Sequence, residues 1–116
     1  MVEISLPVKP LSVNEAWQGR RYKTDKYQRY ERDLLFLLPR TKLPPPPLKI
    51  YYEFGFSNGR SDYDNPCKPL GDILQKKYGF DDNAIYLAVI RKVVVSRGKE
   101  YIKIRIEHFD GPIDSV

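Results

Sequence analysis

LKIYYEFGFS, residues 48–57, is the stretch of sequence that decides the fold. From Leu48 to Phe56 every second residue is a large apolar or aromatic side chain, and the residues between are smaller or polar. Because successive side chains of a strand point to opposite faces of a sheet, this spacing predicts a long strand with one face in the core. The rest of the chain must supply neighbouring strands and helices that cover this apolar face.

Three further segments are expected to join this strand in one sheet of about four strands. Val2 to Leu6 alternates apolar and polar residues before Pro7. Residues 85–95 are rich in β-branched side chains, and residues 102–106 alternate isoleucine with charged residues. Arg97-Gly98 lies between the last two segments and favours a tight turn, so the sequence predicts a hairpin there.

Two amphipathic helices are predicted. The first begins after Thr24 or Asp25, either of which is a suitable N-cap, and Pro39 stops it. The second begins at Asp64 or Asn65, has Pro66 in its first turn, and ends at residues 78–79. The expected order is β-α-β-α-β-β, an α+β fold with a mixed sheet covered by two helices.

The composition is typical of one small globular domain. The chain has 116 residues, of which 41% are hydrophobic and 30% charged, and we expect a domain over residues 1–108 with a tail over 109–116. The net charge of +5 favours polyanionic partners. A single cysteine excludes an intramolecular disulfide and a thiolate cluster. No long apolar segment is present, so we expect a cytoplasmic protein without a membrane partner.

RSDYDNPCK, residues 60–68, is the segment that carries chemistry. If Asp62 and Asp64 lie at the end of a strand, their two-residue spacing points both carboxylates to one face, where like charges need a cation. Oxygen ligands without a nearby His or Cys favour Mg²⁺, with Mn²⁺ able to substitute. An EF-hand is excluded, because Cys67 and Ile73 stand where that loop needs glycine and glutamate.

The helix predicted after this segment adds to the hypothesis of a phosphate-handling site. Its N-terminal amides would favour phosphate oxygens, and Lys68 lies within its first turn. Asp72 comes four residues later, where it can pair with Lys68 or support the metal ligands, and the second role is preferred. Asp81-Asp82 follows the helix and can close the site.

Simpler interpretations of these segments remain open. An Asp-x-Asp run before a helix is often a cap and a solvated turn, and taken alone that interpretation is favoured. The run Pro44–Pro47 is interpreted as a stiff surface crossover, with a ligand for a proline-reading domain as the alternative. Cys67 is expected in the core, and His108 is given no role.

Several separated motifs, in order, resemble those of the RusA family of Holliday junction resolvases (crossover junction endodeoxyribonucleases) of bacteria and their phages. The resemblance rests on the segment 60–68, on Asp72, and on the sequence GFDD at 79–82. The opening segment, with Leu6-Pro7, Ser12-Val13-Asn14 and Arg21-Tyr22, is also similar to that of the family. The match extends from about Ile4 to Ile106. Two departures, Ser61 and Asn83-Ala84, bear on DNA contacts and sequence preference rather than on the acidic residues.

The resemblance implies a RusA-like endonuclease domain that resolves four-way DNA junctions by paired symmetric nicks, as a homodimer and with Mg²⁺. Carried over by position, it implies that Asp62, Asp64 and Asp82 bind the metal and that Lys68 contributes to catalysis. Roles next to the metal ligands are expected for Asp72, Asn65 and Asp81. No small-molecule cofactor is expected, and a phage or prophage origin would suit the family.

A basic stretch with interleaved tyrosines precedes and enters the first helix. Residues Arg20, Arg21 and Lys23, together with Arg60 and Lys68, are the expected DNA contacts. Tyr27 and Tyr30 are expected in the core, and Trp17 is interpreted as a loop anchor in preference to a wedge that stacks in a junction.

Two other functions remain open from the sequence. One is a junction-binding protein without cleavage, which the intact carboxylate set disfavours because negative charge hinders phosphate docking. The other is a general magnesium-dependent nuclease without junction preference. Cleavage assays on a four-way junction and a matching linear duplex would separate the three functions.

Overall fold

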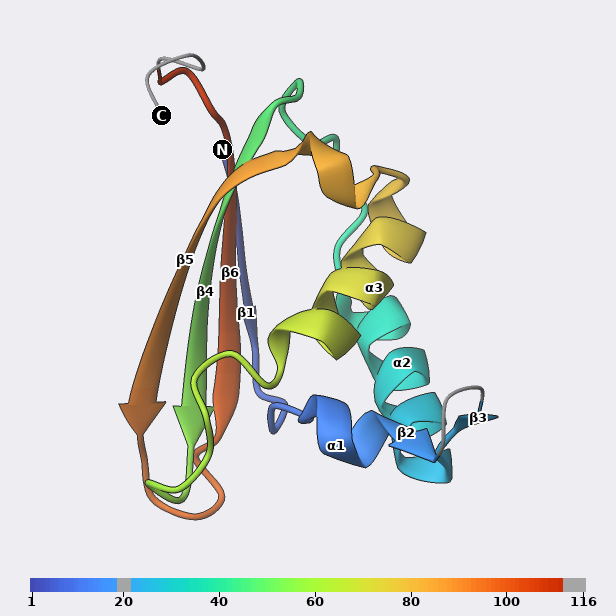
Figure 1. The fold of residues 1–116 in the computed structure, drawn as a ribbon, viewed down its shortest axis with the longest axis vertical. Coiled ribbons are helices and arrows are strands. Elements are labelled where there is room, and N and C mark those ends of the chain that lie inside the picture. Colours follow the sequence, from blue (N-terminus) through green and yellow to red (C-terminus); the bar gives the residue numbers. More distant parts are fainter. Residues whose placement is uncertain (19–21, 112–116) are drawn as a thin grey trace.

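The computed structural model describes residues 1–18 and 22–111, which form a four-stranded sheet with the helices on one side (Figure 1). The strand order is β1-β6-β4-β5. Strand β6 is antiparallel to both β1 and β4, whereas β4 and β5 are parallel, so the sheet is mixed. The predicted α+β fold with a four-stranded sheet is confirmed. The strands are β1 (Val2–Leu6), β4 (Leu48–Phe56), β5 (Ile85–Val94) and β6 (Tyr101–His108).

The helical layer is richer than the sequence indicated. The two predicted helices are present, and a short third helix and a two-stranded sheet lie between β1 and the first of them. Ser12 accepts a hydrogen bond from the amide of Glu15, and Glu15 bonds back to the Ser12 amide, which is a capping box that the Ser-x-x-Glu spacing could have revealed. The elements are α1 (Val13–Ala16), β2 (Trp17–Gln18), β3 (Tyr22–Lys23), α2 (Asp25–Leu37), α3 (Cys67–Tyr78) and the 3₁₀ turn η1 (Asp82–Ala84).

Helix α2 begins and ends as predicted. The Thr24 side chain accepts a hydrogen bond from the Tyr27 amide, so Thr24 is the N-cap. Tyr27, Tyr30 and Leu34 are buried on one face of the helix, which confirms the two tyrosines as core residues. Trp17 packs against this core, with its ring centroid 5.9 Å from that of Tyr27.

Helix α3 starts later than predicted, at Cys67 rather than at Asp64 or Asn65. The prolines give the reason. Neither Pro66 nor Pro69 has an amide hydrogen, so the helical hydrogen-bond ladder cannot extend back to residues 62 and 65. The Leu70 amide makes the bond to the Pro66 carbonyl at 3.2 Å, and Gly79 ends the helix with a φ of 72°.

The predicted hairpin between residues 85 and 106 is wrong. Strands β5 and β6 lie on opposite sides of β4 and do not pair with each other. The turn itself is correct, since the Lys99 amide bonds to the Ser96 carbonyl at 2.9 Å and Gly98 has a φ of 87°. Residues 95–100 are long enough to step over one strand, about 10 Å, so β4 is inserted between the two.

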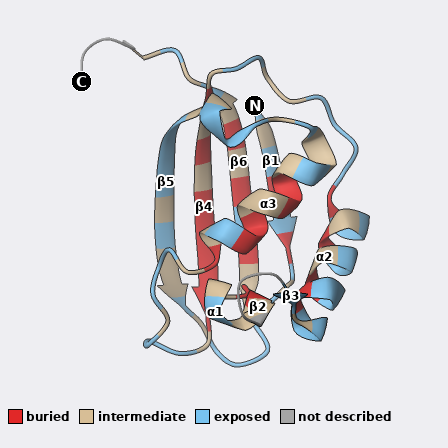
Figure 2. Cartoon of the chain, turned by 45° about the vertical axis from the view of Figure 1, so that its right-hand side comes forward, coloured by how far each residue is buried: buried red, intermediate tan, exposed pale blue. Residues whose placement is uncertain are grey.

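One apolar core lies between the sheet and its helices. Alternate residues of β4 face this core, and α3 crosses directly over β4 and β6 (Figure 2). Burying each large aliphatic side chain contributes about 1.5–3 kcal/mol, so this contact holds α3 against the sheet. Fully buried members of the core include Leu34, Leu48, Ile50, Phe54, Leu70, Ile73, Leu74, Ile102 and Ile106.

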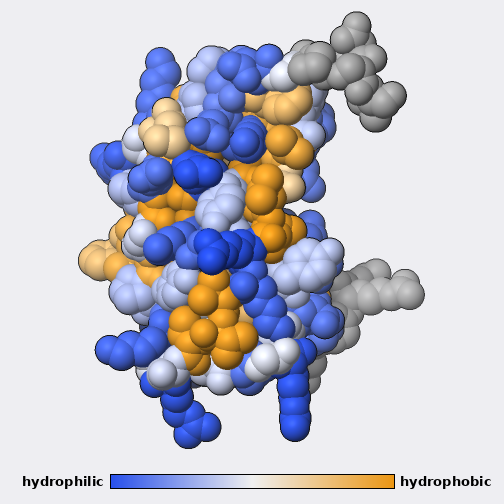
Figure 3. Space-filling model, turned by 90° about the vertical axis from the view of Figure 1, so that its left-hand side faces the viewer, coloured by the Kyte–Doolittle hydropathy of each residue, from blue (hydrophilic) through white to orange (hydrophobic). Residues whose placement is uncertain are grey.

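The opposite face of the sheet carries charged side chains with apolar patches between them (Figure 3). At its centre Glu53 is only 8% exposed. Its carboxylate accepts hydrogen bonds from the hydroxyls of Tyr51 (2.9 Å) and Tyr101 (2.6 Å), and Arg91 and Lys103 lie within 4 Å of it.

The proline run crosses between α2 and β4 and is bonded to the end of β6. The Phe109 amide donates to the Pro47 carbonyl at 2.8 Å, and a ring nitrogen of His108 lies 2.7 Å from the Pro45 carbonyl oxygen. This supports the interpretation of a surface crossover. Within the described ranges, no helix has the length and apolar character needed to cross a membrane. Of the predicted tail, residues 112–116 lie outside the described residues.

Candidate functional site

Asp62 and Asp64 lie in the connection between β4 and α3. Strand β4 ends at Phe56, six positions before Asp62, so the condition that the two aspartates lie at a strand end is not met. The rule that side chains two residues apart in a strand point to the same face therefore does not apply to the Asp62 and Asp64 carboxylates. Both side chains are exposed, and each lies in the turn that leads into α3.

The backbone before Asp62 is held by two side chains from different parts of the fold. The Asn58 side-chain oxygen accepts hydrogen bonds from the amides of Arg60 (2.9 Å) and Ser61 (3.0 Å). The Lys92 ammonium, on β5, donates to the carbonyls of Gly59 (2.8 Å) and Ser61. Sequence reasoning missed both residues. The Asn58-Gly59 pair is a turn signal, and Lys92 stands at a core-facing position of β5, in register with the buried Phe54.

The backbone after Asp62 is also fixed. The Asn65 amide lies 3.4 Å from the Asp62 carbonyl, and the Cys67 amide lies 3.0 Å from the Asp64 carbonyl. The Val13 amide, at the start of α1, donates to the Asn65 carbonyl at 3.0 Å. The N-terminal motif and the aspartate turn, which are far apart in the sequence, are thus in direct contact.

The N-terminus of α3 offers less to an anion than the sequence suggested. Two of its first positions, Pro66 and Pro69, have no amide hydrogen, and the Cys67 amide is used by Asp64. Among the described hydrogen bonds, none uses the Lys68 backbone amide. An anion at this helix end would therefore depend mainly on the Lys68 side chain.

Lys68 pairs with Asp72 one helical turn later. The ammonium lies 3.1 Å from the Asp72 carboxylate, and the Lys68 side chain is 62% exposed. This is the alternative that the sequence had placed second. The exposed pair is weak, because solvent screens it, so Lys68 can leave Asp72 for a stronger anion at small cost.

Asp81 and Asp82 lie beside the second half of α3. Asp81 is the N-cap of η1 and accepts a bond from the Asn83 amide at 3.3 Å. Asp82 accepts a bond from the Gln75 side chain at 3.2 Å. Gln75 is eight residues beyond Cys67, about 12 Å along a helix, so Asp82 and the Asp62–Asp64 turn lie toward opposite ends of α3.

The structure does not gather the three predicted metal ligands into one cluster. Within residues 1–18 and 22–111, no group of three or more His, Cys, Asp or Glu side chains is arranged to hold a metal ion. The assignment of Asp62, Asp64 and Asp82 as ligands remains a prediction.

A partly buried thiol, Cys67, and a buried phenol, Tyr52, lie near the aspartates. Burial raises the pKa of the Cys67 thiol to about 11, and the negative charge of Asp64 adds to the shift. Burial also raises the pKa of the Tyr52 hydroxyl, with smaller effects from Cys67 and Asp82. Both groups therefore stay protonated at neutral pH, and Cys67 acts as a packing residue, as predicted.

The predicted DNA contacts are only partly within the described structure. Arg20 and Arg21 lie outside the described residues. Lys23 lies 3.3 Å from the Glu31 carboxylate and 5.1 Å from the centre of the Tyr27 ring, so its charge is largely engaged within the protein. Arg60 is exposed beside the aspartate turn.

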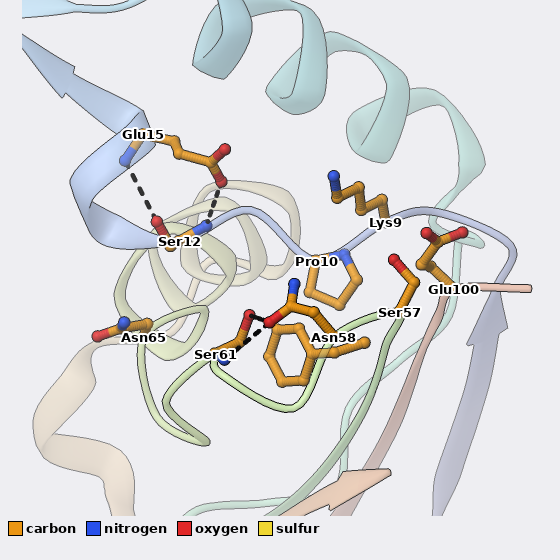
Figure 4. Close-up of a pocket in the computed structure, with 10 residues that line it drawn as sticks. Lys9, Pro10, Ser12, Glu15, Ser57, Asn58, Ser61, Asn65 and Glu100 are labelled. Carbon is orange, nitrogen blue, oxygen red and sulfur yellow. Dashed lines mark hydrogen bonds between the residues drawn. The ribbon is translucent and has the colours of Figure 1, made fainter. Parts of the chain in front are cut away.

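A pocket of about 210 Å³ borders the aspartate turn (Figure 4). Its wall on one side is the segment from Lys9 to Glu15, and on the other the loop that includes Asn58, Ser61 and Asn65. Glu100 closes the far side, and a hydrogen bond from Ser57 lowers the pKa of its carboxyl group. The pocket is lined mainly by polar groups and lies next to the two aspartates.

Comparison with known proteins gives no relative: no family model matches the chain, and no curated protein matches it. The RusA resemblance therefore remains a prediction from the motifs.

Proposed function

We propose that the chain is a magnesium-dependent endonuclease of the RusA type that resolves four-way DNA junctions as a homodimer. The observation that carries the proposal is the exposed turn with Asp62 and Asp64, which leads into α3 and its Lys68. In a basic protein, two neighbouring carboxylates on the surface oppose DNA binding unless a cation joins them there.

The donor chemistry of this turn fits Mg²⁺. Among the described residues, neither Asp62 nor Asp64 makes an ion pair, and both offer the hard oxygen ligands that Mg²⁺ prefers. Asp62 and Asp64 would hold the ion, and Asp82 is the third ligand that the RusA resemblance implies. When bound, the metal supplies charge stabilisation at the phosphate and a water of lowered pKa.

The protein side chains around the turn have distinct roles in this proposal. Lys68 leaves Asp72 and neutralises charge that develops on the phosphoryl group, or positions the attacking water. Arg60, next to the carboxylates, contacts the backbone of the DNA strand that is cleaved. Arg20 and Arg21 contact a DNA arm, and Lys23 joins them when its ammonium leaves Glu31. Asn65 and Asp81 support the turn and η1, where Asp62, Asp64 and Asp82 are located.

The experiment that tests the function uses a labelled synthetic four-way junction and a linear duplex of the same sequence, each with Mg²⁺ or EDTA. Cleavage of the junction alone, only with Mg²⁺, is the expected result. Equal cleavage of both substrates supports a general nuclease instead. Tight junction binding without cleavage supports a non-catalytic junction-binding protein.

A further inference from the structure

Lys92 occupies a position on the core-facing side of the sheet, where an apolar residue is expected. It pairs in register with Phe54 on β4, which is fully buried, and so faces the helical side of the sheet. A lysine there buries part of its stem and must bring its ammonium to a polar partner.

The partners of that ammonium are two carbonyl oxygens of one loop. The Lys92 nitrogen lies 2.8 Å from the Gly59 carbonyl and also bonds to that of Ser61, and it lies 5.9 Å from the Phe56 ring centre. Hydrogen bonds with a charged donor are about twice as strong as those between neutral groups. Ser61 is the residue immediately before Asp62, so Lys92 fixes the chain at the entry to the candidate site.

Asn58 complements this contact from within the loop. Lys92 donates to backbone carbonyls, and the Asn58 side chain accepts from the amides of Arg60 and Ser61. Backbone donors and backbone acceptors between residues 59 and 61 are therefore both hydrogen-bonded. The segment contains Gly59, whose backbone would otherwise be the freest in the loop.

We infer that Lys92 is a positioning residue that fixes the backbone before Asp62 and thereby determines where the Asp62 carboxylate is presented. Its consequence for catalysis rests on the proposed function, because metal sites and phosphoryl transfer demand ligands held within a fraction of an ångström. Its consequence for loop structure does not depend on any activity.

Amide hydrogen exchange tests the structural part directly. In Lys92→Met, the amides of Arg60 and Ser61 are expected to exchange about tenfold faster than in the wild type, while amides in the centre of β4 are unchanged. Lys92→Gln retains a hydrogen-bond donor without the charge and is expected to lie between the two. Lys49→Met is the matched control, because it removes a lysine from the uncovered face of β4, near Glu107 rather than the loop.

Magnesium titration of junction cleavage tests the catalytic part. Lys92→Met is expected to need about tenfold more Mg²⁺ for half-maximal cleavage, a shift typical of lost support around a metal site, whereas Lys49→Met behaves as the wild type. Lys92→Arg, which keeps charge and donors, is expected to recover part of the loss.

Unchanged exchange at Arg60 and Ser61 in both Lys92→Met and Lys92→Gln overturns the inference, and so does an equal change in Lys49→Met. If loop exchange is faster but the Mg²⁺ requirement is unaltered, the inference that Lys92 determines where the Asp62 carboxylate is presented is overturned. If the wild type cleaves no junction, the proposed function fails, whereas the exchange experiment still decides whether Lys92 fixes the loop.

Discussion

The ring of Tyr101 occupies the space that a side chain at residue 55 would need. A Cβ at Gly55 would come within 2.5 Å of two Tyr101 ring carbons, closer than real Cβ contacts allow. The close approach lets the Tyr101 hydroxyl reach Glu53 at 2.6 Å. Gly55 therefore leaves the space that Tyr101 needs to reach Glu53 on the uncovered face of the sheet.

Gly55→Ala is expected to destabilise the protein by about 1–3 kcal/mol, because the extra methyl forces Tyr101 or the strand to move. The measurement is urea unfolding at neutral pH. Gly59→Ala is the control: a Cβ there meets no atom within 4 Å, so its effect should stay within about 0.5 kcal/mol. Equal losses in the two variants would show that Tyr101 does not need the space.

Glu53 should make stability depend on pH. The hydrogen bond from Tyr101 holds the pKa of Glu53 below its ordinary value of 4.5, against the opposing effect of burial, and Tyr51, Lys103 and Arg91 add to the lowering. Because the folded state favours the carboxylate, the stabilisation is complete above about pH 4.5 and is lost as the pH falls through the lowered value.

The comparison of wild type with Glu53→Gln isolates this effect. The wild type should be the more stable protein at pH 7, and the difference should shrink steadily below pH 4.5 in unfolding experiments. Glu107→Gln, at a more exposed pair with Lys49, should show little difference at any pH. A difference between wild type and Glu53→Gln that stays constant from pH 7 to pH 3 would contradict the prediction.

The three predicted metal ligands can be tested by removing charge without changing shape. Asp62→Asn, Asp64→Asn and Asp82→Asn are each expected to reduce junction cleavage by about 100-fold or more, while junction binding is kept or strengthened because negative charge facing DNA is removed. Cleavage rates and gel-shift affinities measure the two effects separately. Asp33→Asn, on the exposed side of α2, should leave both unchanged. Near-normal cleavage by all three variants would contradict the assignment of Asp62, Asp64 and Asp82 as metal ligands.

The sequence predicted which segments form elements better than it predicted how they pair. Alternation in residues 48–56 requires a strand, and β4 is indeed one of the two inner strands of the sheet. Pairing is decided by the whole fold: α3 returns the chain beside β4, so β5 must be parallel to it, and the turn at Gly98 then leads past β4. The residues of the turn suit both a hairpin between β5 and β6 and a connection that crosses over β4, so the sequence could not distinguish the two.

The candidate site was predictable in its residue types but not in its support. The aspartates are close in sequence, so the turn could be located from Asp62 and Asp64 alone. The contact of Lys92 with Ser61 joins residues 31 positions apart and depends on the register of β5. Likewise, Pro66 and Pro69 are visible in the sequence, but the number of free amides at the N-terminus of α3 depends on where the helix begins. That start, at Cys67, is known only from the structure.

The edge of the sheet formed by β5 is the surface we expect to join two copies of the chain. It is ten residues long, and within the described residues its outer edge pairs with no other strand. An exposed edge strand is a template for pairing with another chain, and the exposed charge on β5 is Arg91, which pairs with Glu53 of the neighbouring strand. The exposed apolar side chains of β5 are Tyr86, Leu87, Val89 and Val94, which are 40–60% exposed.

Val89→Lys should therefore convert the proposed homodimer to a monomer, because a charge in the middle of the edge opposes pairing across a two-fold axis. Light scattering should give twice the 13.6 kDa chain mass for the wild type and the chain mass for the variant. Val89 is 40% exposed, so the fold should survive, as circular dichroism can check. Ser5→Lys, on the opposite edge strand β1, should remain dimeric.

On a cruciform plasmid the wild type should make paired nicks in one binding event, since each protomer supplies one site, while Val89→Lys should release a nicked intermediate. A wild type that is monomeric both free and on DNA would contradict the dimer and favour a general nuclease, and a variant that stays dimeric would place the interface on another surface.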